Sequence, residues 1–185
     1  MRAFIAIDFP SEVKREIVAW RGDLVKAFPS ISWIPEENLH LTLKFLGVTR
    51  QERAIKQFLE TLAARNHSLL LEFSHPGFFQ KSQLLLFLSL KRSLPLLSLI
   101  EQLEEGMTHL GLAKEKRTHV PHVTIGRGRN IGKKDAVEIQ RFLVEKSSPP
   151  RISFSASQIT FFESILTRIG PRYTPLACFS LLPVV

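Results

Sequence analysis

Residues 39–46 read Leu39-His-Leu-Thr-Leu-Lys-Phe-Leu46, and apolar and polar side chains alternate from the first residue to Phe45. Because successive side chains of a β-strand point to opposite faces, the pattern predicts a strand with its leucines and Phe45 on the core face. His40, Thr42 and Lys44 are expected together on the other face. The stretch therefore predicts a row of polar side chains that is anchored from behind by a hydrophobic core.

The pattern returns in the second half of the chain as His122-Val-Thr-Ile125. The two histidines are separated by 122 − 40 = 82 residues, close to half of the 185-residue chain. Residues i and i+2 of a strand share a face, so His122 and Thr124 are expected side by side, with Val123 and Ile125 pointing into the core. The repeat indicates two lobes with similar strands that face each other.

Hydrophobic periodicity and turn residues divide the rest of the chain into further elements. They predict strands over residues 2–9, 32–34, 68–74, 83–90, 151–155, 157–166 and 172–181, and helices over residues 11–28, 50–65, 94–111 and 133–146. Ser11 is the predicted cap of the first helix. Many strands are neighbours in the sequence, which favours antiparallel sheets with helices packed outside over a doubly wound parallel sheet. We therefore expect an α+β fold.

Length, composition and charge narrow the class of protein. With 44% hydrophobic and 23% charged residues, the chain of 185 residues has the balance of one globular domain, which we expect to span residues 1–185. The formal net charge of +8 and the pI of about 10.0 favour a partner rich in phosphate. A basic surface without a dedicated partner would have the same composition.

The only cysteine and the opening residues bear on the compartment. Cys178 excludes an intrachain disulfide, which fits a reducing compartment, and its apolar surroundings predict a small buried side chain. No apolar run is long enough to cross a bilayer, and Asp8 and Pro10 cut short an opening run that would otherwise resemble a signal peptide. We expect a cytoplasmic monomer that is not attached to a membrane.

Two imidazoles that face one cavity suit acid–base catalysis on a phosphodiester. The unperturbed pKa of histidine is about 6.5, so one neutral ring would take a proton from water while the other, protonated, gives one to the leaving oxygen. The hydroxyls of Thr42 and Thr124 and the cations of Lys44 and Arg127 would hold phosphate oxygens as charge builds. This chemistry requires no metal or other cofactor. The structural alternative is a pair of half-buried histidines that only hydrogen-bond their neighbours.

Longer strings around both motifs carry a resemblance to a known family. They are, in order, residues 2–10 (RAFIAIDFP), 33–47 (WIPEENLHLTLKFLG), 121–127 (PHVTIGR), 159–164 (ITFFES) and 173–176 (YTPL). The chain resembles the two-histidine phosphoesterase superfamily, and within it the RNA 2′,3′-cyclic phosphodiesterases once called 2′-5′ RNA ligases. The likeness covers nearly the whole chain, and Ile125 stands where leucine is usual in the family.

The resemblance implies a bilobal fold in which two antiparallel sheets, related by a pseudo-two-fold axis, face a central groove. It implies hydrolysis of a terminal 2′,3′-cyclic phosphate of RNA to a 2′-phosphomonoester, with the reverse joining of 2′-phosphate and 5′-hydroxyl ends as a side activity. By the same analogy His40 is the proton donor to the leaving 3′ oxygen, and His122 is the base that activates water. Thr42 and Thr124 would bind phosphate, and Arg127 stands where the family often has a basic residue.

A cluster of cations brackets the second motif. Residues 114–134 hold Lys114, Lys116, Arg117, Arg127, Arg129, Lys133 and Lys134 against the single acid Glu115. The cluster predicts contact with an RNA backbone, with a solvated loop and helix end as the alternative. Phe9, Phe78 and Phe79 are candidates for stacking on a base, although core packing suits each of them better.

Two other ligand classes are not expected. His119-x-x-His122 has the residue types of a metal site, but on a strand this spacing places the rings on opposite faces, and no acidic pair lies close in the sequence. Residues 126–133 (GRGRNIGK) lack the glycine spacing and the Ser or Thr of a phosphate-binding loop. We therefore expect no bound metal and no ATP, GTP or NAD.

Two other functions stay open at the level of sequence. A phosphodiesterase for a small cyclic nucleotide or a 2′,5′-linked oligonucleotide would use the same two histidines, although the net charge of +8 favours RNA. A non-catalytic RNA-binding module would keep the scaffold and show salt-dependent affinity without turnover. The intact histidines and threonines of both motifs argue against such a module.

Overall fold

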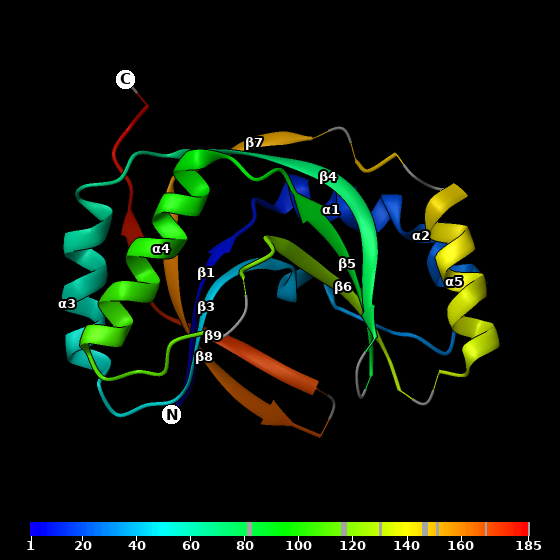
Figure 1. Ribbon diagram of the computed structural model, residues 1–185, viewed down its shortest axis with the longest axis horizontal. Helices are drawn as coiled ribbons and strands as arrows, with labels where there is room; N and C mark the ends of the chain where they lie inside the picture. The colour runs from blue at the N-terminus through cyan, green and yellow to red at the C-terminus, as the bar shows by residue number, and fades with distance from the viewer. Residues whose placement is uncertain are drawn as a thin grey trace.

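Two antiparallel sheets organise the protein. The computed structural model describes residues 1–80, 83–115, 118–129, 131–145, 148–150, 152–168 and 170–184. In this part of the chain every pair of neighbouring strands is antiparallel, and the helices lie outside the sheets (Figure 1). The predicted α+β fold is confirmed.

The first sheet carries the first motif on an edge strand. Its strands, in the spatial order β3-β1-β8-β9, are β3 (His40–Val48), β1 (Arg2–Asp8), β8 (Gln158–Thr167) and β9 (Gly170–Ser180). Helices α3 (Glu52–Ala63) and α4 (Leu94–His109) pack against this sheet. Strands β8 and β9 form a hairpin that extends away from these helices toward the bottom of Figure 1.

The second sheet carries the second motif. Its strands, in the spatial order β2-β6-β5-β4-β7, are β2 (Ser32–Trp33), β6 (His122–Gly128), β5 (Leu84–Leu90), β4 (Leu69–Gln80) and β7 (Ser153–Ala156). Helix α5 (Lys133–Glu145) packs against β4, and Phe142 on α5 contacts Phe28 at the end of α2. The two motif strands β3 and β6 contact each other where the lobes meet.

The single helix predicted over residues 11–28 is wrong, because the chain forms α1 (Ser11–Trp20) and α2 (Gly22–Ala27) with a break at Arg21. The guanidinium of Arg21 turns inward, donates a hydrogen bond of 3.1 Å to the carbonyl of Ile125 and lies over the ring of Trp33. Ser11 does not cap the helix, because it is the first helical residue and Pro10 holds the cap position. A third short helix, the 3₁₀ turn η1 (Glu36–Asn38), leads into β3.

A β-bulge in β3 overturns the predicted faces of Lys44 and Phe45. Thr42 pairs with Ala6 but Lys44 pairs with the next residue, Ile5, so β3 has one extra residue at this point. An extra residue reverses the alternation of side chains beyond it. Lys44 therefore points into the interior and is 5% exposed, whereas Phe45 faces outward on the side of the motif and is 67% exposed.

Strand β6 contains the matching bulge. Thr124 pairs with Phe87, Gly126 with Leu86 and Arg127 with Leu85, which leaves one extra residue on β6. Arg127 consequently shares a face with Thr124, as Phe45 does with Thr42. The resemblance between the lobes thus extends past the two His-x-Thr strings, because residues 45 and 127 are also 82 positions apart.

The face of the first sheet that carries the motif also carries the lone cysteine. Thr42 pairs with Ala6, Ala6 with Thr160 and Thr160 with Cys178, so the four residues form one row across the sheet. The hydroxyl of Thr160 and the thiol of Cys178 are 3.7 Å apart. Cys178 is exposed, so the prediction of a buried cysteine is wrong. The apolar residues around it alternate along an edge strand and do not enclose it.

Candidate active site

The first motif holds its imidazole by both ring nitrogens. Nδ1 of His40 lies 2.8 Å from the carbonyl oxygen of Asn38, and Nε2 lies 3.0 Å from the hydroxyl of Thr42. A carbonyl only accepts hydrogen bonds, so Nδ1 carries the single proton of the neutral ring. Nε2 is then unprotonated and can accept a proton. The rings of Phe4 and Tyr173 pack beside the imidazole, at centroid distances of 4.9 and 5.2 Å.

The surroundings of His40 favour the neutral ring. Burial lowers the pKa of His40 to about 4, and the charges of Lys14 and Arg127 act in the same direction. The hydrogen bond to Asn38 and the charge of Asp8 act against this shift and do not overcome it. The free protein therefore holds His40 without a proton on Nε2 at neutral pH.

The second motif repeats this arrangement. Nδ1 of His122 donates to the carbonyl of Val120 at 2.6 Å, so Nε2 is again the free nitrogen. The rings of Phe79 and Phe87 each lie 5.4 Å from the imidazole. Burial lowers the pKa of His122 as well, although the hydrogen bond to Val120 opposes the shift. In both motifs the ring is thus oriented by the carbonyl two residues earlier in the chain.

Two features connect the motifs across the lobes. Nε2 of His119, which leads into β6, lies 3.0 Å from the carbonyl oxygen of Thr42 on β3. The charge of Arg127 on β6 acts on His40 and on Tyr173, which both belong to the first lobe. Arg127 of the second lobe therefore lies near enough to act on His40 of the first lobe, and the register of β6 puts Arg127 on the face that carries His122 and Thr124.

Lys44 does not belong to this group, and its prediction as a phosphate ligand is contradicted by its position. Its Nζ lies 2.8 Å from a carboxylate oxygen of Glu104 and 2.9 Å from the carbonyl of Ala113. Both partners belong to α4 and the segment after it, behind the sheet. The bulge in β3 is the physical reason, since it turns Lys44 to the face opposite that of His40.

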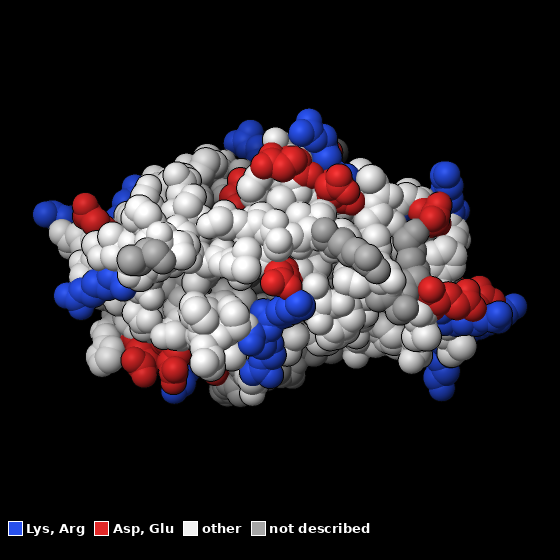
Figure 2. Space-filling model, turned by 90° about the horizontal axis from the view of Figure 1, so that it is seen from above, with Lys and Arg blue, Asp and Glu red and all other residues white. Residues whose placement is uncertain are grey.

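The predicted cation cluster is only partly described. Lys116 and Arg117 lie outside the described residues, and Lys114, Arg129, Lys133 and Lys134 are exposed. On the face shown in Figure 2, basic and acidic side chains alternate and form no continuous basic patch. Phe9 is buried in the core against Phe154, so it is not available to a base.

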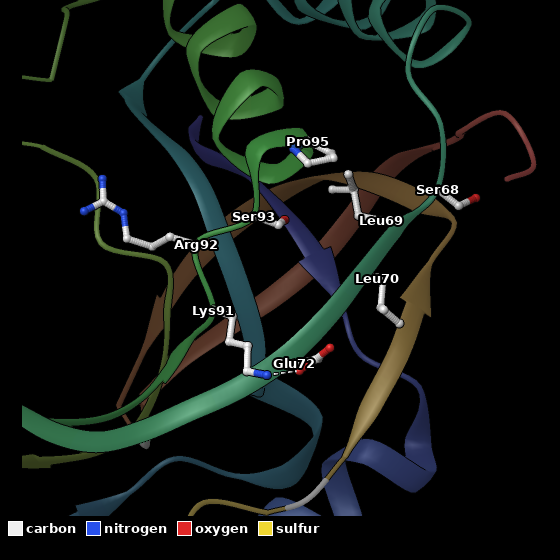
Figure 3. A pocket seen from close by; sticks show the side chains of 8 residues that line it. All are labelled: Ser68, Leu69, Leu70, Glu72, Lys91, Arg92, Ser93 and Pro95. Atoms are coloured by element: carbon white, nitrogen blue, oxygen red, sulfur yellow. Dashed lines mark hydrogen bonds and ion pairs between the residues drawn. The ribbon is translucent and has the colours of Figure 1, made fainter.

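A hollow in the described part of the protein lies apart from the motif residues. It has a volume of about 340 Å³ and is lined by Ser68, Leu69, Leu70, Glu72, Lys91, Arg92, Ser93 and Pro95 (Figure 3). Lys91 and Glu72 form an ion pair in it. None of the residues predicted to act in the site lines this hollow. Among the described residues, no three His, Cys, Asp or Glu side chains gather as a metal site requires.

Sequence reasoning missed three groups of this site. The sequence suggests only a metal ligand for His119 and a core position for Phe45. The carbonyls of Asn38 and Val120 were not considered, although both residues stand two positions before a motif histidine. That shared offset is the one signal in the sequence that could have revealed them.

A two-lobed α+β fold that presents a repeated His-x-Thr strand from each lobe is the arrangement expected of a two-histidine phosphoesterase. The sequence pattern of the 2'-5' RNA ligase superfamily matches residues 9–165. The chain belongs to this superfamily.

Curated relatives match over nearly their whole length. A protein of Thermotoga maritima named RNA 2',3'-cyclic phosphodiesterase is 33% identical over 181 residues, which cover 95% of this chain and 93% of the relative. The protein of the same name from Methanocaldococcus jannaschii is 31% identical and covers 94% of this chain and 96% of its own.

Solved structures of Escherichia coli LigT share the fold. The apo form has a TM-score of 0.79 at 26% identity and covers 98% of this chain and 97% of its own. The complex of the same protein with 3'-AMP has a TM-score of 0.76 at 27% identity, with 97% of each chain covered. No helix in the described part of this chain is long and apolar enough to span a membrane.

Proposed function

We propose that this protein is an RNA 2′,3′-cyclic phosphodiesterase, which hydrolyses a terminal 2′,3′-cyclic phosphate to a 2′-phosphomonoester. The observation that carries the proposal is the repeated site, in which two imidazoles are each fixed by a backbone carbonyl at Nδ1, on strands where a threonine two residues later shares the face of the histidine. Its full-length relatives bear the same name. A basic chain with a net charge of +8 fits a polyanionic substrate.

The proposed reaction uses one histidine as base and the other as acid. Nε2 of His122 takes a proton from water, and the water oxygen forms a new bond to phosphorus. The bond between phosphorus and the 3′ oxygen breaks, and Nε2 of His40 gives its proton to that oxygen. The products are a 3′-hydroxyl and a 2′-phosphate, and one further proton exchange with solvent restores the starting state.

Phosphate binding is assigned to Thr42 and Thr124, which share the faces of the motif histidines by strand alternation, and to Arg127, which follows the bulge of β6 onto the same face. Hydroxyl and guanidinium donors stabilise the charge that builds on the phosphate oxygens in the transition state. The bound phosphate anion also places a negative charge near His40, which the free protein lacks. This charge raises the pKa of His40 and offsets the effect of Arg127. The anion therefore favours the protonated form of His40 in the complex.

The test is the hydrolysis of a short RNA that ends in a 2′,3′-cyclic phosphate, with EDTA present. The wild type is expected to yield the 2′-phosphate, and His40→Ala and His122→Ala are each expected to lose at least about a hundredfold in kcat. His67→Ala is the matched control, because His67 is exposed and its Nδ1 bonds the carbonyl of Pro183. If His40→Ala and His122→Ala are as active as the wild type, the proposed mechanism is wrong.

The same assay separates the competing functions. Turnover of small cyclic nucleotides or 2′,5′-linked oligonucleotides, with no turnover of RNA ends, would identify a nucleotide phosphodiesterase. Salt-dependent RNA binding without turnover would identify a binding module. Formation of a 2′,5′ linkage from 2′-phosphate and 5′-hydroxyl ends would measure the reverse reaction. The proposal further describes a cytoplasmic monomer, and sedimentation of the pure protein tests the oligomeric state.

A further inference from the structure

His119 is a half-buried histidine whose side chain makes one hydrogen bond within the described part of the chain, and that bond crosses between the lobes. Its Nε2 lies 3.0 Å from the carbonyl oxygen of Thr42. A carbonyl only accepts, so Nε2 carries the proton. In the neutral ring Nδ1 is then a bare acceptor, and it is buried with no hydrogen-bond partner among the described residues.

The orphaned nitrogen indicates a constrained ring. A buried polar atom without a partner costs free energy, so it persists where the surroundings hold the side chain for another reason. The bond to Thr42 is such a reason. Among the described strands β3 is the edge of its sheet, and His119 supplies a hydrogen-bond donor to the carbonyl of Thr42 on this strand. His119 therefore uses its only donor on the backbone of the first motif.

The position of His119 in the chain links this bond to the second motif. The next residue, Val120, supplies the carbonyl that accepts from Nδ1 of His122 at 2.6 Å. The residue that donates to Thr42, His119, therefore stands next to Val120, whose carbonyl sets the tautomer and the ring plane of His122. In the first motif, the residue with the corresponding carbonyl, Asn38, is fixed by its own side chain, which donates to the carbonyl of Pro171.

We infer that His119 is a positioning residue for the reaction, which ties the segment before the second motif to the carbonyl of Thr42 and so fixes His122 relative to the first motif. His119 contacts no reacting atom in this scheme. It acts through Val120, whose carbonyl keeps Nε2 of His122 free to act as the base. The inference rests on the proposed function only for its kinetic readout, because the tautomer of His122 is measurable without substrate.

The test compares His119→Gln with His119→Leu. The amide nitrogen of glutamine reaches about as far as Nε2 of histidine and restores a donor to Thr42, whereas leucine fills similar space without one. His119→Leu is expected to lose on the order of 10- to 100-fold in kcat with little change in KM, since a small misplacement of a catalytic group has an effect of this size. His119→Gln is expected to recover most of the lost rate.

A second readout is the ¹⁵N NMR spectrum of the His122 ring in the free protein. The wild type and His119→Gln are expected to show the proton on Nδ1, whereas His119→Leu is expected to show a mixture of both tautomers. His109→Leu serves as the control, because His109 is exposed on α4 and its Nδ1 bonds the carbonyl of Glu105 one turn earlier. Thermal melting of all variants separates unfolding from misplacement.

The outcomes are distinguishable. If the wild type does not hydrolyse RNA ends but the tautomer shifts as expected, the proposed function fails and the positioning stands. If His119→Leu is folded, shows the wild-type tautomer and keeps the wild-type kcat, the positioning role is refuted. Equal losses in the glutamine and leucine variants would also overturn it, because the donor would then not be what matters.

Discussion

Replacing Lys44 by methionine tests whether this lysine supports the fold or binds the substrate. Methionine keeps most of the volume of the lysine stem but removes the ammonium, which donates to Glu104 at 2.8 Å and to Ala113 at 2.9 Å. The affected carboxylate oxygen of Glu104 also accepts from the backbone of Glu115 at 2.6 Å. The substitution therefore removes the charged centre of a small network between β3 and the segment after α4.

The loss in the free energy of unfolding follows from the burial of Lys44 and of Glu104. Burial raises the pKa of Glu104, but the hydrogen bonds from Lys44 and the backbone of Glu115, with the charges of Lys44 and Lys114, together hold that pKa below its ordinary value. Removing one partner of a buried pair costs about 3–5 kcal/mol. The Glu104 side chain is 17% exposed, so water recovers part of this and we expect a loss of roughly 2–4 kcal/mol. For a domain of this size that loss lowers Tm by roughly 4–16 °C.

The assay pairs urea denaturation with hydrolysis measured well below Tm. Lys44→Met is expected to lose stability and to keep kcat/KM within about threefold, and the double variant Lys44→Met with Glu104→Leu is expected to regain part of the stability. A variant of unchanged stability whose kcat/KM falls by a hundredfold, about 2.7 kcal/mol of transition-state binding, would refute the reasoning. Lys44 would then contact the substrate after all.

Two further predictions follow from the pKa values and from the bulges. The pH profile of kcat/KM is expected to peak between about pH 4 and 6.5, because burial lowers the pKa of His40 to about 4 and that of His122 below its ordinary value. Activity falls at lower pH, where His122 becomes protonated, and at higher pH, where His40 loses its proton; a profile that rises to a plateau above pH 7.5 would contradict these roles. Gly126→Ala places a Cβ 2.8 Å from Ile31, so it is expected to cost about 1–3 kcal/mol and to lower kcat/KM by shifting the bulge of β6. Gly22→Ala is its control in urea denaturation and kinetics, since nothing lies within 4 Å of the added Cβ, and equal effects of the two variants would show that the bulge is irrelevant.

The sequence predicted the strands and helices well because their signals are local. Alternation along residues 39–46 and the repeat at His122 indicated both motif strands and two similar lobes. The bulges could not be predicted, since each arises from the register of a partner strand and not from the residues of the bulged strand itself. Lys44 and Phe45 were therefore assigned to the wrong faces.

Other errors have the same origin in tertiary contacts. The helical spacing of residues 11–28 is continuous, yet Arg21 interrupts the helix to reach the carbonyl of Ile125, 104 positions away in the sequence. The contact of His119 with Thr42 joins residues 77 positions apart and leaves no trace in local pattern. The tautomers of the motif histidines depend on backbone carbonyls, and the sequence of side chains does not show where these carbonyls point.

Cys178, at the end of the row that starts at Thr42, is a natural site for a fluorescent label. The thiol is exposed and is the only one in the chain, so a maleimide dye attaches at one known position. Its backbone lies three strands from Thr42 on the same face, about 14 Å away at the usual strand spacing. A fluorophore there reports arrival and departure of RNA in real time, with no engineered cysteine and no background labelling to remove.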